Sequence, residues 1–419
     1  MEQGIGKIGI GIDIGTSKIA IAVGQHKEGL TNIIGIGTTP NSGLRRGTIC
    51  DPEEVISSLS AAVEDAQRVS GVSINHGVLG INGEGVRTST SRGVVAVSRP
   101  DGEIDEQDID KAVDSARSVA LPPNNEIIHV FPQNFTIDGG EQTKEPLGIK
   151  GTRLEVEIMV VGIPSANITN LTKVTTQTDI QSDTIIFNPI AAARAILSKQ
   201  QKEQGVMLID IGAGTTSYAI YAEGEIVDAG VLPVGSNYIT NDIAVGLRTT
   251  LEMAEKIKRE MLEVDKKKIK DTDMLDLSKI TGDQDEEKIT KHKLFEIADA
   301  RLKEIFSMAR KELKRNKLDG LLPAGAILTG GGANLKGIVS NAKEGLQLPV
   351  QIGIPSFEVG GMVDKLDDPS YSTSIGLMLY GLELGVEEGN AGGKNFGIKN
   401  VNFGGIVGKA KNIFKQFLP

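Results

Sequence analysis

Two stretches of the chain share one order of apolar and polar positions. Residues 7–23 and 206–221 each consist of an apolar run rich in β-formers, a glycine-containing turn and a second apolar run. The tetrapeptide Ile-Asp-Ile-Gly ends the first run both times, at residues 12–15 and 209–212. Apolar runs separated by a glycine turn predict a strand, a tight turn and a second strand. The chain is therefore expected to contain two related hairpins, about half its length apart.

Each predicted hairpin continues into a third strand and a helix. In the first half the strand covers residues 32–37, and a helix follows Asp51 as N-cap with Pro52 as its first residue. In the second half the strand covers residues 226–232, and a helix begins after Gly235. A repeat of four residues alone is weak evidence, but a repeated order of three strands and a helix is much stronger. We therefore predict an α/β protein with two related lobes.

A separate block lies between the two halves. Residues 84–162 contain short strands, the clearest at 126–138 and 154–161, and a predicted helix at 106–119. That much chain is enough for a small α+β subdomain inserted between the halves. After the second hairpin, residues 245–316 are rich in Lys and Glu and predict a block of helices.

Composition restricts the classes of protein that fit. The 419 residues carry 45 Lys and Arg against 55 Asp and Glu, a net charge of −10 that argues against a nucleic-acid-binding protein. The one cysteine, Cys50, excludes an internal disulfide and is expected at a small buried position, in the reducing cytoplasm. Four histidines are too few for a Cys/His zinc site, and His129 is expected to be structural. We expect neither a secretory signal nor a membrane span, because no apolar run approaches ~20 residues.

The two glycine turns carry residue types that bind phosphate. Each turn follows an aspartate at the end of an apolar strand and exposes backbone N–H groups that can donate to phosphate oxygens. The first turn comprises Asp13, Gly15, Thr16, Ser17 and Lys18, and the second comprises Asp210, Gly212, Gly214, Thr215 and Thr216. We expect the turns to hold the phosphates of a nucleotide from opposite sides. Asp13 and Asp210 would then bind Mg²⁺ through water.

A third glycine-rich turn follows the apolar residues 326–328. Missing side chains there would let a sugar or base approach the backbone of Gly330, Gly331, Gly332 and Ala333. Together the three turns resemble the nucleotide cleft of the actin, sugar-kinase and Hsp70 superfamily. The resemblance implies a two-lobed, ribonuclease H-like ATPase fold with ATP as the nucleotide. Three helical residues resemble the adenosine side of that cleft, although surface charge at helical spacing explains them equally well: Glu255, Lys258 and Arg259.

The sequence leaves enzyme activity open. Hydrolysis requires a residue that orients or activates water, and Asp210 is the candidate that the second turn offers. No dedicated base stands out beside it, so slow ATP hydrolysis is the most that we expect.

The inserted block resembles one family within that superfamily, the actin-like bacterial division protein FtsA. The segments that carry the resemblance are Gly-Ile-Asn-Gly-Glu-Gly at 80–85, Ser-Arg-Gly-Val-Val at 91–95, and residues 104–109, 127–138 and 146–156. The resemblance runs essentially from end to end. It implies subdomains 1A at 1–83 and 164–203, 1C at 84–163, 2A at 204–243 and 312–369, and 2B at 244–311. It also implies a helix returning to 1A at 370–385, a flexible linker at 386–403 and an amphipathic helix at 404–419.

The C-terminal pattern supports a membrane anchor independently. Residues 389–419 contain five Lys and no acidic residue, so this tail carries +5 on an otherwise acidic chain. On a helix, one set of tail residues gathers on an apolar face, with Lys409 on the polar side. The apolar set is Ile406, Val407, Ala410, Ile413, Phe414, Phe417 and Leu418. A basic amphipathic helix after a glycine-rich linker is typical of an anchor at an anionic membrane surface.

The family resemblance supplies partners and place. It implies binding of the FtsZ C-terminal peptide by 2B, with Lys293 and Arg301 as candidates for ion pairs, and assembly of the protein into an actin-like filament. It also implies further division proteins as partners, and a peripheral position on the cytoplasmic side of the inner membrane at the division site. Polymerisation would present many tails at once and raise membrane avidity.

Three other functions share parts of this pattern. A sugar kinase would need a carboxylate base and a sugar pocket in place of the insert. An Hsp70-like chaperone would need a large β-rich domain after the ATPase unit, and residues 385–419 are too few. A PilM-like adaptor of type IV pilus assembly is the serious alternative, because it shares the core and the insert. It would bind an extended peptide of a membrane protein and would not need its own lipid-binding helix.

Overall fold

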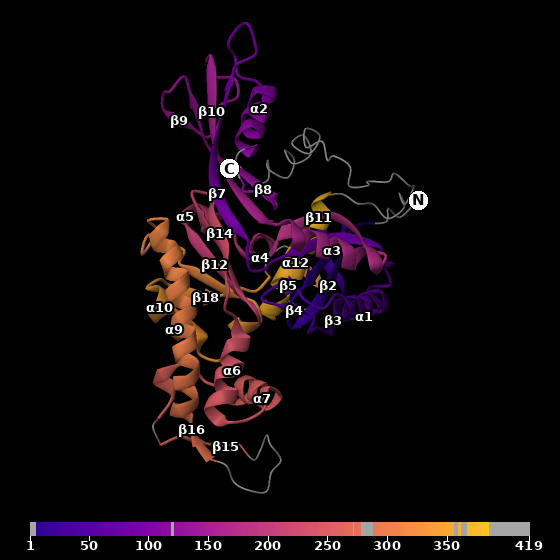
Figure 1. Ribbon diagram of the computed structural model, residues 1–419, viewed down its shortest axis with the longest axis vertical. Coiled ribbons are helices and arrows are strands. Elements are labelled where there is room, and N and C mark those ends of the chain that lie inside the picture. Colours follow the sequence, from indigo (N-terminus) through magenta and orange to yellow (C-terminus); the bar gives the residue numbers. More distant parts are fainter. Residues whose placement is uncertain are drawn as a thin grey trace.

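The computed structural model describes residues 6–118, 121–270, 272–277, 288–355, 359–361 and 367–384. These residues form two lobes, each built on a mixed β-sheet, and an inserted subdomain with a sheet of its own (Figure 1). The inserted subdomain and the helical part of the second lobe lie at opposite ends of the long axis (Figure 1).

The first lobe contains a six-stranded sheet in the order β11-β6-β1-β2-β3-β19. β1 (Lys7–Ile14), β2 (Lys18–Lys27) and β3 (Leu30–Pro40) are antiparallel neighbours. Three further strands pair in parallel: β6 (His76–Ile81), β11 (Gln181–Phe187) and β19 (Val359–Gly361). A small hairpin, β4 (Leu44–Arg45) and β5 (Thr48–Ile49), follows β3.

Helix α1 (Pro52–Ser70) begins where the capping residues predict. The Asp51 side chain accepts from the backbone N–H of Glu54, and Gly71 ends the helix with φ of 71°, a conformation that favours glycine. Cys50, just before this cap, is exposed, so the expectation of a buried position is wrong. Its backbone N–H is held by the Gly43 carbonyl, and this turn directs the side chain outward. The lobe also contains α3 (Ser165–Gln177), α4 (Asn188–Ile196) and α5 (Lys199–Gln204).

The second lobe repeats the first, as the sequence predicts. Its sheet has the order β14-β13-β12-β17-β18. The strands are β12 (Val206–Ile211), β13 (Thr216–Ala222), β14 (Glu225–Leu232), β17 (Ala326–Thr329) and β18 (Val350–Ile352). In both lobes three antiparallel strands precede a helix, and the first of them pairs in parallel with a later strand.

A helical part extends from this second sheet. It contains α6 (Ser236–Leu247), α7 (Leu251–Met261), the 3₁₀ turn η1 (Lys266–Lys268), β15 (Met274–Asp276), β16 (Lys288–Thr290) and α9 (Lys291–Arg315). Helix α9 runs without a break through the predicted 2B–2A boundary at residue 311. One continuous helix therefore joins the far end of this part to the sheet. Helix α10 (Ile338–Leu346) packs against α9.

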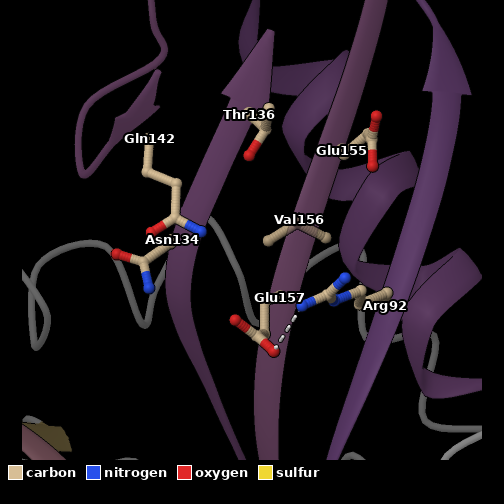
Figure 2. Close-up of a pocket in the computed structure, with 7 residues that line it drawn as sticks. All are labelled: Arg92, Asn134, Thr136, Gln142, Glu155, Val156 and Glu157. Atoms are coloured by element: carbon tan, nitrogen blue, oxygen red, sulfur yellow. Dashed lines mark hydrogen bonds and ion pairs between the residues drawn. The ribbon is translucent and has the colours of Figure 1, made fainter. Parts of the chain in front are cut away.

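The inserted subdomain is a four-stranded sheet with one helix. The order is β7-β10-β8-β9, with β7 (Arg87–Ala96), β8 (Asn125–Ile137), β9 (Gln142–Thr143) and β10 (Arg153–Pro164). Helix α2 (Glu106–Arg117) covers one face and forms a small core with the even-numbered residues 154–160 of β10. The opposite face carries polar side chains around a hollow of about 70 Å³, where Arg92 pairs with Glu157 at 3.4 Å (Figure 2).

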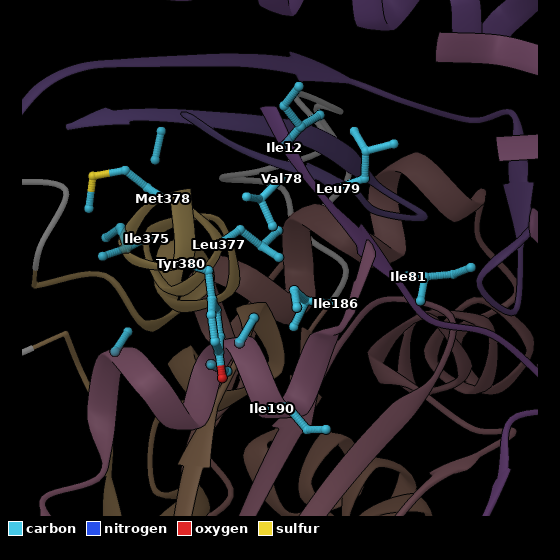
Figure 3. Packing of buried hydrophobic residues seen from close by; sticks show 14 of the residues in the cluster. Ile12, Val78, Leu79, Ile81, Ile186, Ile190, Ile375, Leu377, Met378 and Tyr380 are labelled. Carbon is cyan, nitrogen blue, oxygen red and sulfur yellow. The ribbon is translucent and has the colours of Figure 1, made fainter. Parts of the chain in front are cut away.

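The last described helix, α12 (Ser372–Leu384), returns to the first lobe and is buried there. It lies among Ile12, Val78 and Ile186 of the first sheet (Figure 3). Such close packing requires glycine: a Cβ on Gly376 would lie 1.8 Å from the carbonyl oxygen of Ala191. Two short 3₁₀ turns precede it in the chain, η2 (Gly331–Asn334) and η3 (Pro369–Tyr371).

Candidate functional site

The β1–β2 and β12–β13 turns have the same backbone bond. The Gly15 N–H donates to the Lys18 carbonyl at 3.0 Å, and the Gly212 N–H donates to the Thr215 carbonyl at 2.9 Å. The turns face each other, because a Cβ on Gly214 would lie 2.8 Å from the Thr16 hydroxyl oxygen. Side-chain-free backbone at this point lets the two lobes approach with their turns in contact.

The structure brings Asp13 and Asp210 together at these turns. Burial raises the pKa of Asp13 to about 6, against the nearby charge of Lys18 and a hydrogen bond from Asn188 at 3.0 Å. Burial raises the pKa of Asp210 to about 7, and repulsion from Asp13 adds to the effect. The Thr373 hydroxyl donates to Asp210 at 3.3 Å. Two buried carboxylates that repel each other fit a divalent cation, which would relieve the repulsion.

Lys18 lies at the same place, but its ammonium group contacts the turn before α12. It donates to the Ser370 hydroxyl at 2.7 Å and lies 3.7 Å from the centroid of the Tyr371 ring. A lysine side chain has enough rotatable bonds to turn from these contacts toward a phosphate.

The third glycine-rich turn lies beside Asp210. Gly330 has φ of 80°, and a Cβ there would lie 2.1 Å from an Asp210 carboxylate oxygen. A Cβ on Gly331 would approach nothing closer than 3.9 Å, whereas Gly332 and Ala333 are buried. The three turns therefore lie close together in the structure, with Gly331 on their open side.

The three candidate residues on α7, Glu255, Lys258 and Arg259, do not all line a cleft. The Lys258 ammonium is buried and donates to the Thr240 hydroxyl at 2.8 Å and the Ser236 carbonyl at 3.3 Å. Glu255 pairs with Lys258 at 2.6 Å and accepts from the Thr240 hydroxyl at 2.6 Å. These two side chains therefore fix α7 to α6, while Arg259 is exposed. Their role toward a nucleotide stays a prediction.

The α9 candidates lie on one helix with different surroundings. Lys293 is exposed in the first turn of α9. Arg301 donates to both carboxylate oxygens of Asp242 on α6, at 2.8 and 3.0 Å, and also pairs with Glu304. Any acidic ligand would have to compete with Asp242 for this guanidinium. The predicted linker and the candidate membrane residues 406–418 lie outside the described residues.

Several side chains of the site were not predicted. Asn188 and Thr373 contact the two aspartates, and Ser370 and Tyr371 contact Lys18. They come from distant parts of the chain, and only the folded topology brings them to the turns. The prediction for His129 is confirmed: its Nε2 accepts from the Phe187 backbone N–H at 3.0 Å, and burial lowers its pKa to about 4.

The part of the chain that the structure describes contains neither a metal cluster nor a helix that could cross a membrane. No group of three or more His, Cys, Asp or Glu in this part of the chain is placed to hold a metal ion. Across the same residues, no helix combines the length and the apolar character that crossing a membrane requires.

Solved structures define the class of protein. PilM in the "PilM-PilN type IV pilus biogenesis complex" matches with a TM-score of 0.65 and 15% identity, covering 89% of this chain and 98% of that one. MreB5 of Spiroplasma citri bound to ADP matches with a TM-score of 0.52 and 17% identity, covering 89% and 96%. Identities this low show the fold alone. The two-lobed fold with facing glycine turns is that of an actin-like protein.

Sequence comparisons define the family within this class. The family model described as "Cell division protein FtsA" matches residues 207–376, and the "SHS2 domain inserted in FTSA" matches residues 83–162. FtsA of Pseudomonas aeruginosa is 36% identical over 379 residues, which cover 90% of each chain. FtsA of Bacillus subtilis is 33% identical, covering 88% of this chain and 82% of that one. The chain belongs to the FtsA family of cell-division proteins.

Proposed function

We propose that this protein binds ATP and Mg²⁺ between its lobes, polymerises on the inner face of the cytoplasmic membrane and tethers FtsZ filaments there during septum assembly. The observation that carries the nucleotide part is the convergence of Asp13, Asp210 and three glycine-rich turns at the meeting point of the lobes. MreB5 of the same fold was solved with ADP and with AMPPNP, which supports a nucleotide in this place.

The chain's own groups suit each part of that ligand. Exposed N–H groups of the two turns would donate to phosphate oxygens, and Lys18 would add one positive charge. Asp13 and Asp210 would orient the water shell of the magnesium ion. When bound, Mg²⁺ supplies positive charge that neutralises phosphate and carboxylate together. Asp210 remains the candidate for orienting a hydrolytic water, and slow hydrolysis at most is expected.

The partner site that we propose lies where α6 and α9 meet. Lys293 and Arg301 supply positive charge for the acidic FtsZ peptide. Close by, Val245 is 79% exposed on α6, one helical turn beyond the Asp242 that pairs with Arg301. Leu251 at the start of α7 is 59% exposed. Because exposed ion pairs contribute little affinity, this apolar surface would supply most of it.

The membrane part rests on the tail sequence. A single basic amphipathic helix binds anionic lipid weakly, so the tails of a filament would act together. The experiment compares sedimentation with anionic liposomes, in the presence of ATP, for the full chain and for a chain ending at Phe403. We expect only the full chain to sediment.

A matched pair of substitutions distinguishes the contribution of the apolar face to membrane binding from the effect of an added negative charge. Phe414→Glu adds an acid on the apolar face and should release the protein, whereas Gln416→Glu adds the same acid on the polar face and should retain most binding. Equal sedimentation of the full and shortened chains would contradict the tether. It would favour a PilM-like adaptor that docks on protein.

A further inference from the structure

One tyrosine lies between two arginines that belong to different parts of the molecule. The Arg46 Nε–H, at the tip of the β4–β5 hairpin in the first lobe, donates to the Tyr238 hydroxyl at 2.9 Å. On α9, the guanidinium carbon of Arg301 lies 5.3 Å from the centroid of the Tyr238 ring. Tyr238 stands on α6, one turn before the Asp242 that holds Arg301 in two hydrogen bonds. Tyr238 therefore contacts the first lobe and the proposed peptide site at once.

Helix α6 is fixed to the second glycine turn. The backbone N–H groups of Ser236 and Asn237 donate to the carbonyls of Gly212 and Ala213, both at 2.9 Å. Gly235 packs so closely that a Cβ on it would lie 2.6 Å from the Ala213 carbonyl oxygen. A shift of this turn must therefore move the N-terminal end of α6, and Tyr238 with it.

Arg46 is fixed to the first lobe in a comparable way. Arg46 and Gly47 have φ of 48° and 74°, which defines a tight hairpin tip. The Glu84 N–H donates to the Arg46 carbonyl at 3.1 Å, and the Glu84 carboxylate pairs with the guanidinium at 3.2 Å. The Arg46 backbone nitrogen lies 3.2 Å from the place of a Cβ on Gly214. The Arg46–Tyr238 bond thus crosses between the lobes beside the two turns, and it requires the lobes to be close.

We propose that Tyr238 is a positioning residue that couples closure of the lobes over a nucleotide to the affinity of α9 for an acidic peptide. The inference rests on the proposed function, because it assigns regulation to the two sites named there. In the closed state Arg46 bonds to Tyr238, and in the open state this bond is broken.

The direction of the coupling follows from charge. Arg46 brings its guanidinium to the hydroxyl end of the ring that contacts Arg301, and this adds positive charge beside the surface that Glu84 offsets only in part. Donation to the hydroxyl also withdraws electron density from the ring and weakens its contact with the Arg301 guanidinium. The added charge attracts an external carboxylate to this surface, and the weaker ring contact leaves the Arg301 guanidinium freer to turn from Asp242 toward it. Nucleotide therefore tightens peptide binding, and by linkage the peptide tightens nucleotide binding by the same factor.

The test measures fluorescence anisotropy of a labelled peptide with the acidic C-terminal sequence of FtsZ from the same organism. The full chain is titrated, below its assembly concentration, with and without AMPPNP and Mg²⁺. We expect nucleotide to tighten peptide binding of the unsubstituted protein about fivefold or more. Tyr238→Phe keeps the ring beside Arg301 but removes the hydroxyl acceptor, so this ratio should fall to about one.

Arg46→Ala should have the same effect as Tyr238→Phe. Its matched control is Arg45→Ala, which removes an equal charge from the neighbouring exposed residue of the hairpin and should keep the ratio of the unsubstituted protein. Nucleotide affinity measured without peptide should fall only severalfold in Tyr238→Phe and Arg46→Ala, because one hydrogen bond of the closed state is lost, and should stay unchanged in Arg45→Ala. A folding defect would abolish nucleotide binding instead.

The possible outcomes distinguish the proposed coupling from the proposed peptide site on which it rests. If the unsubstituted protein binds peptide and Arg301→Glu abolishes that binding, but nucleotide leaves the affinity unchanged, the coupling is wrong and the peptide site stands. Retention of the full ratio by Tyr238→Phe would equally overturn the coupling. If the peptide does not bind at all, the proposed peptide site fails and the coupling fails with it.

Discussion

Two buried aspartates in the second lobe have opposite surroundings. Asp228 accepts hydrogen bonds from Thr88, Tyr218, Arg315 and Asn316 at 2.6–3.1 Å. Asp210 instead faces Asp13 and accepts from Thr373 at a longer 3.3 Å. Buried carboxylates with full sets of donors stabilise a fold, whereas buried carboxylates near another negative charge destabilise it. The first environment is suited to structure and the second to a cationic ligand.

The same substitution should therefore have opposite effects at the two positions. The pKa of Asp210 is raised to about 7, so the folded protein binds this proton more tightly than the unfolded chain does. Stability from this group is lost as pH rises from about 4 to 7. Asp210→Asn removes this loss of stability and should raise the free energy of unfolding at pH 8 by roughly 4 kcal/mol, because each unit of the raised pKa corresponds to about 1.4 kcal/mol. Urea unfolding measures this change, and ATP-dependent assembly should be lost in the same variant.

Asp228→Asn is the matched control. It presents an amide N–H to groups that donate and breaks the pair with Arg315, so it should lower the free energy of unfolding by about 2–3 kcal/mol. Destabilisation by both substitutions would show that Asp210 carries no electrostatic strain.

At the scale of elements, short-range signals were sufficient for the repeated hairpins and the capped helices. Asp51 and Pro52 define the start of α1, and the strand–turn–strand order defines β1–β2 and β12–β13. The buried position of Lys258 could not be predicted, because an isolated charge at helical spacing gives no sign of the Thr240 hydroxyl and Ser236 carbonyl that bind it. The exposed side chain of Cys50 depends likewise on the backbone bond to Gly43.

A neutral histidine of the inserted subdomain forms a hydrogen bond with the first lobe. His129 on β8 accepts from the N–H of Phe187, where β11 ends and α4 begins, and its pKa is lowered to about 4 by burial. A depressed histidine pKa gives stability that is present above the unfolded value near 6.5 and is lost as pH falls toward 4. We expect a loss of roughly 2 kcal/mol between pH 7 and pH 4.5 from this group.

Comparison with His129→Gln isolates this contribution. The aspartates at the glycine turns have the opposite pH dependence in the same range, so the difference between variant and unsubstituted protein is the informative quantity. That difference should shrink as pH falls. His26→Gln, at a half-buried histidine on β2, is the matched control for the loss of an imidazole elsewhere, in the first lobe. A profile for His129→Gln parallel to that of the unsubstituted protein would contradict the role of the neutral ring.

At the scale of the whole molecule, α12 links the site to the tail. Its first residues contact the glycine turns, since Thr373 bonds to Asp210 and Ser372 bonds to Thr329 at 2.9 Å. Its body is buried in the first lobe, and the chain continues from its end into residues 385–419. The proposed nucleotide site and the proposed anchor are thus connected through the same C-terminal stretch of chain, but assembly and membrane binding should be separable by experiment.

Changing the number of tails on each molecule separates membrane binding from assembly. Asp210→Ala should abolish ATP-dependent assembly while leaving the tail sequence unchanged, so each molecule would approach the membrane with a single weak anchor. It should therefore fail to sediment with anionic liposomes. Adding a second copy of residues 404–419 after Pro419 raises the effective concentration of the second anchor without restoring assembly. This chain should sediment again, with or without ATP, and a copy carrying Phe414→Glu should not rescue it. Strong liposome binding by Asp210→Ala with one tail would show that membrane attachment does not depend on polymerisation.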